Sequence, residues 1–220
     1  MRQLSSRSAS ERRQSRRALA ALAVTCIGTY GALLAGSAWT SGLQDWTLLL
    51  PDLGLAIVAA MAAALAGAWR ATLPLACRVR WLMLAAPVAL LSMLVAVGYV
   101  ELLGGRDAGD GGDGEANAAA VLATWVAVVV ITPLVEEWLC RGVAWRAVAT
   151  LANERSAWLA TAVLFAFLHG MGGGFLLELP HRFVGGLLFG WLRWRSRSLL
   201  PGVAAHALHN ALAVALAGAD

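Results

Sequence analysis

The sequence has few charged residues, no lysine and no cysteine motif. Charged residues make up only 14% of the 220 residues, whereas hydrophobic residues make up 60%, and the mean hydropathy is +0.69. A soluble domain does not need so much apolar surface, so most of the excess is expected to face lipid. The composition therefore excludes an ordinary soluble protein and predicts that the lipid bilayer is a partner.

Two common kinds of metal or redox site are also missing. Cys26, Cys77 and Cys140 are isolated, and no CxxC spacing occurs. This excludes a zinc ribbon and gives no sign of a disulfide framework. The HExxH motif is absent as well, which excludes the common zincin arrangement.

The net charge of +4 comes from arginine alone and does not indicate nucleic-acid binding. Many arginines lie in short segments between apolar runs, where they indicate topology. Six precede the first apolar run: Arg2, Arg7, Arg12, Arg13, Arg16 and Arg17. The positive-inside rule then predicts a cytoplasmic N-terminus, with no nucleic-acid partner.

Apolar runs long enough for transmembrane helices recur along the chain. They predict an all-α, polytopic transmembrane helical bundle of about seven spans. The first run is too long for the h-region of a signal peptide, so it is expected to be a retained span. The predicted spans are residues 18–39, 47–69, 81–103, 118–150, 156–171, 175–193 and 198–218.

Four regions follow from this pattern: a cytoplasmic basic tail (1–17), a three-span region (18–103), a loop (104–117) and a helical core (118–218). The loop, GGRDAGDGGDGEAN, is rich in Gly and Asp but lacks the ligand spacing of an EF-hand. It is expected to be a flexible, extracytoplasmic linker. Ionisable residues enter the apolar runs mainly after it, so the chemistry is expected in 118–218.

The first polar motif is Glu136-Glu137-Trp-Leu-Cys-Arg141, which follows a long apolar run. Glu137 and Arg141 are four residues apart on one helix face, and the low dielectric favours their pairing. Glu136 points about 100° away and remains for another task. Taken alone, the motif could also be a charge cluster at the end of a span.

The second motif is Phe165-Ala-Phe-Leu-His169. If residues 118–150 and 156–171 form an antiparallel hairpin that turns near residues 151–153, then Glu136 and His169 lie at nearly the same depth. A carboxylate and an imidazole at one level can share a water molecule. Taken alone, His169 could simply bond to a backbone carbonyl.

The last two motifs lie in the final two predicted spans. Gly186 and Gly190 form a GxxxG pair that predicts close helix packing, expected opposite His206. His206 and Asn210 share a helix face and could donate hydrogen bonds to an oxyanion. His209 lies close to the same face.

In the order and spacing of these motifs, residues 118–214 resemble the CPBP family of CAAX-processing and bacteriocin-processing intramembrane peptidases. The resemblance implies that Glu136 and His169 activate water and that His206 and Asn210 stabilise the oxyanion. It also implies a structural role for Glu137 and Arg141. His209 departs from the family pattern, in which an apolar residue is expected.

The resulting prediction is an intramembrane endopeptidase of the bacterial inner membrane that cleaves a membrane-associated, C-terminally anchored or prenyl-type peptide. One Glu with two His is also a ligand set for catalytic zinc, so Glu136, His169 and His206 form an alternative Zn²⁺ site. The motifs require no other cofactor. The competing hypotheses are a transporter or proton relay, disfavoured because no inverted repeat is found, and a non-catalytic immunity or scaffold relative.

Overall fold

The computed structural model describes residues 8–39, 50–67, 69–103, 118–169 and 175–217. Within these ranges every regular element is a helix, and no strand occurs, so the predicted all-α class is confirmed. The predicted loop 104–117 lies outside the described residues. The first half of the chain contains α1 (Ala9–Trp39), α2 (Leu50–Ala66), α3 (Trp69–Thr72), α4 (Val79–Met83) and α5 (Ala85–Leu102).

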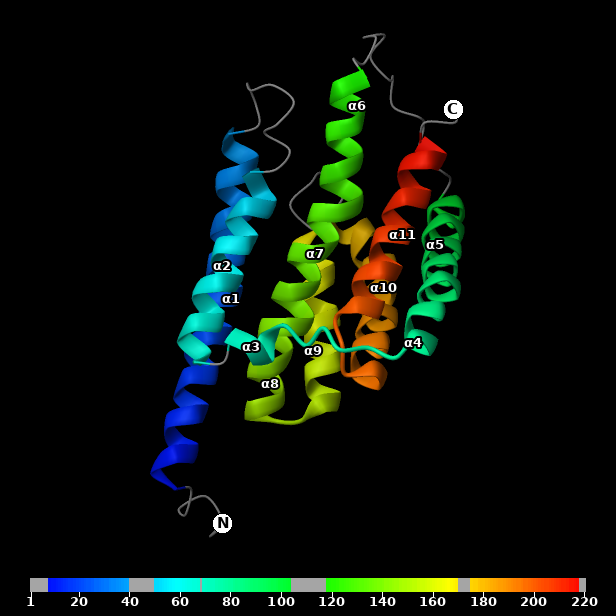
Figure 1. Ribbon diagram of the computed structural model, residues 1–220. Coiled ribbons are helices and arrows are strands. Elements are labelled where there is room, and N and C mark those ends of the chain that lie inside the picture. The colour runs from blue at the N-terminus through cyan, green and yellow to red at the C-terminus, as the bar shows by residue number, and fades with distance from the viewer. Residues whose placement is uncertain (1–7, 40–49, 68, 104–117, 170–174, 218–220) are drawn as a thin grey trace.

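The second half begins with one continuous helical rod, which runs diagonally through the molecule (Figure 1). Two of its segments, η2 and η3, are π-helical and place one extra residue in the turn. Their wider hydrogen bonds run from Thr132 N–H to the Ala127 carbonyl and from Trp145 N–H to the Cys140 carbonyl. The rod consists of α6 (Ala118–Trp125), η2 (Val126–Ile131), α7 (Thr132–Glu137), η3 (Trp138–Ala144) and α8 (Trp145–Leu151).

Three further helices pack beside the rod: α9 (Glu154–Leu168), α10 (Phe175–Ser196) and α11 (Leu200–Ala217). The turn between α8 and α9 lies at the predicted position. Asn153 caps α9, because its side-chain oxygen accepts a hydrogen bond from Ser156 N–H at 2.9 Å. The rod and α9 therefore form the predicted antiparallel hairpin, which places their polar residues at a common level.

Figure 1 shows α1 and α2 as an antiparallel pair on one side of the rod and α5 on the opposite side, against α10 and α11. The extended segment 73–78 crosses between the two sides. Its Pro74 carbonyl accepts a hydrogen bond from Leu199 N–H at 2.8 Å, which ties the crossing to the α10–α11 turn. The N-terminal helices thus enclose the core from both sides.

Each of the seven predicted spans contains a described helix, although the span count itself is not established. Among the residues that the structure describes, three helical stretches could cross a membrane by length and composition: Val79–Leu102, Val121–Leu151 and Leu200–Ala217. Large apolar side chains such as Ile27 and Leu94 are 74% and 70% exposed on the outer surface, as expected where lipid covers a protein. The first helix begins at Ala9, so part of the predicted basic tail (1–17) is helical.

Gly186 and Gly190 do allow close helix packing, but the predicted partner was wrong. A Cβ atom at Gly186 would lie 3.0 Å from the backbone of Ala162 in α9, and one at Gly190 would lie 2.8 Å from Trp158. The glycines therefore face α9 and not His206 in α11. The α10–α11 turn fixes the order of the helices but not the rotation of α10 about its axis, which is why the sequence misplaced this contact.

The α9–α10 contact gives a stability prediction. Gly186→Ala should lower the free energy of unfolding by about 1–2 kcal/mol, because the new methyl group meets backbone atoms that cannot move aside. Gly98→Ala, on open surface in α5, is the matched control and should be neutral or stabilising, since alanine favours helix. Thermal unfolding in detergent micelles measures both, and equal effects of the two substitutions would contradict the packing described.

Candidate active site

Two adjacent carboxylates lie at the end of α7, inside the bundle. Glu136 is 6% exposed and Glu137 is fully buried. Consecutive residues on a helix point about 100° apart, so the two side chains face different neighbours. Glu136 and Glu137 therefore lie in two different environments.

Glu137 forms the predicted ion pair with Arg141, one turn later in the rod. Arg141 Nη1 donates to Glu137 Oε1 at 2.9 Å, and both side chains are completely buried. Arg141 Nη2 also donates to the Gly186 carbonyl at 2.9 Å, and the guanidinium lies 4.4 Å from the centre of the Phe165 ring. A buried charge is costly without such compensation, so these contacts tie the rod to α9 and α10.

A glycine that the sequence reading missed makes room for this pair. A Cβ atom at Gly202, near the start of α11, would lie 2.9 Å from Glu137 Oε2. Gly202 thus lets α11 approach the buried carboxylate closely. The only sequence signal was its position four residues after the start of the last predicted span, which is too weak to assign a contact.

Glu136 faces two histidines from two other helices. Its Oε2 atom lies 3.8 Å from His169 Nε2 at the end of α9 and 3.9 Å from His206 Nε2 in α11. This oxygen is buried and has no hydrogen-bond partner among the described residues. The structure thus brings together Glu136 and His169, which the sequence nominated for water activation, and His206, which it nominated as an oxyanion donor.

The orientation of His169 is set by its own helix. His169 Nδ1 lies 3.0 Å from the Phe165 carbonyl, which can only accept a hydrogen bond, so Nδ1 carries the proton. The neutral ring then presents the lone pair of Nε2 to Glu136. Two acceptors 3.8 Å apart suit a donor such as water between them.

His206 lies between the two carboxylates and is only 1% exposed. Its Nδ1 atom is 3.4 Å from Glu137 Oε1, without the alignment of a hydrogen bond, while Nε2 faces Glu136. The ring stacks on Phe189 at 5.1 Å and meets the edge of Phe165 at 5.2 Å. This aromatic enclosure restricts the ring to one plane.

Asn210 lies one turn after His206 and is bonded to the rod. Its Nδ2 atom donates to the Val128 carbonyl at 2.8 Å. Thr132 N–H bonds to Ala127 in the π-helical pattern, and Pro133, which would follow, has no N–H to offer Val128. The Asn210 amide therefore satisfies a carbonyl that the helix leaves open, and its second N–H remains for another acceptor.

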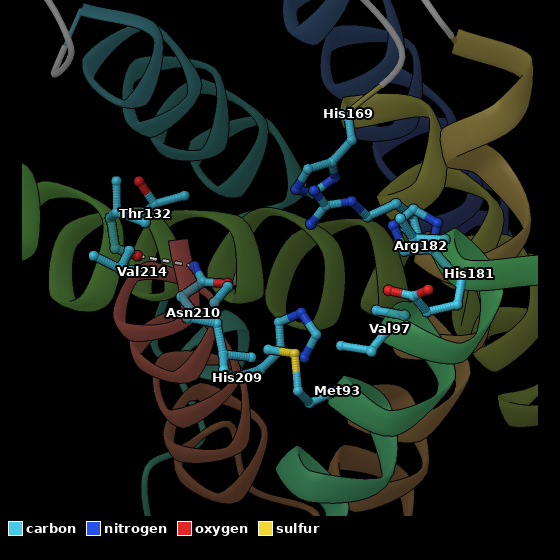
Figure 2. Close-up of a pocket in the computed structure, with 15 residues that line it drawn as sticks. Met93, Val97, Thr132, His169, His181, Arg182, His209, Asn210 and Val214 are labelled. Atoms are coloured by element: carbon cyan, nitrogen blue, oxygen red, sulfur yellow. Dashed lines mark hydrogen bonds between the residues drawn. The ribbon is translucent and has the colours of Figure 1, made fainter. Parts of the chain in front are cut away.

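A cavity of about 490 Å³ adjoins these residues (Figure 2). His169 and Asn210 line it, and so does His209, the histidine that the sequence could not place. His209 Nδ1 has no hydrogen-bond partner in the described part of the chain. The lining also includes His181 and Arg182 of α10, neither of which the sequence reading singled out.

The N-terminal half also contributes a polar contact near the site. Thr132 donates a hydrogen bond of 2.7 Å to Asp52 in α2, and Thr132 also lines the cavity. Asp52 is 6% exposed. No sequence pattern links Asp52 to position 132, so this contact could not be predicted.

The chemistry of the donors would suit a divalent metal, but their arrangement does not. Glu136, His169 and His206 are the types of ligand that bind catalytic zinc. Within the described ranges, however, no three His, Cys, Asp or Glu side chains are arranged to hold a metal ion. The mechanism below therefore passes through no metal.

Comparison with known proteins gives a family match to the region of the chain that contains the candidate site. Residues 118–212 match the family model described as type II CAAX prenyl endopeptidase Rce1-like. The match covers the rod, α9, α10 and most of α11, which is less than half of the chain. No curated protein and no solved structure matches the chain.

The buried ion pair gives a prediction that separates structure from catalysis. Arg141→Met should lower the free energy of unfolding by about 3–5 kcal/mol, because Glu137 loses its counter-ion in the interior. Glu137→Leu combined with Arg141→Met should recover much of this loss, since no unpaired charge remains. Chemical unfolding in micelles measures both, with exposed Arg155→Met as the control. A double variant as unstable as Arg141→Met would contradict the assignment.

Proposed function

We propose that the protein is an intramembrane endopeptidase in which Glu136 activates water, on the basis of the match of residues 118–212 to the Rce1-like type II CAAX prenyl endopeptidases. One observation carries this proposal. The buried Oε2 atom of Glu136 lacks a hydrogen-bond partner among the described residues and faces imidazole nitrogens of two other helices at 3.8 and 3.9 Å. Such a carboxylate suits a general base.

In the first step, water lies between Glu136 Oε2 and His169 Nε2 and donates a hydrogen bond to each. Glu136 takes one proton as the water oxygen attacks the carbonyl carbon of the scissile peptide bond. A tetrahedral intermediate with one negatively charged oxygen results. The Phe165 carbonyl supports this step, because it holds the proton of His169 on Nδ1.

In the second step the C–N bond breaks. Glu136 gives its proton to the leaving amine, so the carboxylate returns to its starting state and the new carboxyl group stays with the other fragment. The negatively charged oxygen that forms in the first step would accept hydrogen bonds from the second N–H of Asn210 and from His206 in the form that carries its proton on Nε2. The bond from Asn210 to Val128 fixes that amide before substrate binds.

The substrate that this family suggests is a membrane-associated, C-terminally anchored or prenyl-type peptide. We place the protein in the bacterial inner membrane with its N-terminus in the cytoplasm. The start of α1, the α8–α9 turn and the α10–α11 turn, which are rich in arginine, lie toward the same end of the bundle (Figure 1). One basic end is the arrangement that the positive-inside rule predicts for a cytoplasmic face.

Substitutions at the three central residues test the mechanism. Glu136→Gln, His169→Ala and His206→Ala should each lower kcat by at least about 100-fold. General-base catalysis by Glu136 and His169 contributes about that much or more, and loss of one oxyanion donor such as His206 costs a similar factor. Mass spectrometry of a cleaved farnesyl-cysteine peptide in proteoliposomes measures the rate, and thermal unfolding of Glu136→Gln confirms folding. Cleavage at the wild-type rate by folded Glu136→Gln would refute the proposal. Ion flux without cleavage would indicate a transporter instead.

The metal-free mechanism has its own test. Purified active protein should contain well below one zinc ion per chain, because no metal takes part in the steps above. Elemental analysis measures the content, and dialysis against a chelator should leave the cleavage rate unchanged. Stoichiometric zinc together with loss of activity in chelator would establish the metallopeptidase alternative.

A further inference from the structure

The cavity beside the reaction centre has a cationic side chain that the mechanism does not use. Arg182 lines it together with His169 and Asn210, two residues of the proposed catalytic set. We propose, building on the peptidase function, that the cavity binds the fragment released from the carboxyl-terminal side of the scissile bond. Arg182 binds the terminal carboxylate of that fragment.

The shape of the cavity favours a short peptide. Its volume of about 490 Å³ lies within the range of about 300–1,000 Å³ that suits small ligands, so it would hold a few residues and not a folded domain. Because His169 and Asn210 also line it, the cavity continues directly from the reaction centre (Figure 2). A peptide whose scissile carbonyl lies at Glu136 can place its adjoining residues here.

The walls of the cavity match an aliphatic peptide with one anionic end. Apolar side chains from two helices, Met93 and Val97 of α5 and Val214 of α11, form one part of the lining. Hydrogen-bond donors at Arg182 and His209 form the other part. Apolar walls with a few convergent polar groups are typical of sites that bind and orient a ligand.

The charge of Arg182 selects among the groups that a peptide could present. Guanidinium is always protonated and matches a carboxylate with two parallel N–H donors. It has five donors in all, so it can keep a contact within the protein and still bind a ligand. A free C-terminus is the anion that every unmodified peptide substrate carries.

Paired peptides test the proposal. Two farnesyl-cysteine peptides with the same three aliphatic residues after the cysteine end in a carboxylate or in a carboxamide. Binding is measured by fluorescence anisotropy on Glu136→Gln protein, which should not cleave them. The carboxylate peptide should bind about 10- to 100-fold more tightly, as a charge-assisted hydrogen bond would give. Adding Arg182→Gln should remove this preference by weakening the carboxylate peptide alone.

Two further variants make the result specific. Arg182→Lys keeps the charge without the bidentate geometry and should restore part of the preference. Arg155→Gln removes an exposed arginine outside the cavity and should leave the preference intact. Equal binding of the two peptides, binding of neither, or an equal loss for both in Arg182→Gln would overturn the carboxylate site.

The same peptides separate failure of this site from failure of the proposed function. If wild-type protein cleaves the two peptides with equal kcat/KM, the peptidase function stands and the carboxylate site is wrong. If wild-type protein cleaves neither, yet the binding preference depends on Arg182, the site stands and the peptidase function is wrong.

Discussion

The buried pair of Glu137 and Arg141 is the interaction on which the active half of the molecule depends. Every helix of the core reaches it. The guanidinium binds a carbonyl of α10 and lies over Phe165 of α9, while Glu137 faces His206 and Gly202 of α11. Because an unpaired charge in this interior would be strongly unfavourable, the pair restricts how these helices can pack.

The pair also determines what the neighbouring carboxylate can do. Arg141 neutralises Glu137, so the charge of Glu136 is left to interact with His169 and His206. A second unpaired carboxylate beside it would oppose ionisation of Glu136. Glu136 and Glu137 therefore have different roles for two reasons. Consecutive side chains on a helix point about 100° apart, and Arg141 lies four residues after Glu137, where it can pair with that residue.

Much of the fold and the site could be predicted because the relevant spacings are local. The positions of the helices, the turn at residues 151–153 and the pairing of Glu137 with Arg141 depend on periodicity within a short segment. The prediction that Glu136 and His169 lie at the same depth required only the hairpin that turns at residues 151–153. Contacts that depend on helix rotation were missed or misassigned, as at Gly186 and Gly202, because no local pattern fixes the azimuth of a packed helix.

The contacts of the N-terminal helices also could not be predicted from local sequence patterns. Their apolar composition identified them as helices but gave them no role, and the bond from Thr132 to Asp52 joins residues eighty positions apart. The family match begins at residue 118 and leaves these helices unmatched. Their structural contribution is to close the core on two sides and to supply a polar partner beside the cavity.

The π-helical turn at Val126–Ile131 has a consequence for how such chains can diverge. Removing one residue there would convert the wide turn into an ordinary one and rotate the preceding helix by about 100° relative to the carboxylates. Every motif from Glu136 onward would keep its spacing, yet the carbonyl that Asn210 holds would turn away. Two homologues could therefore share all the signature residues and still differ in competence, and the length of the segment before the first motif would distinguish them.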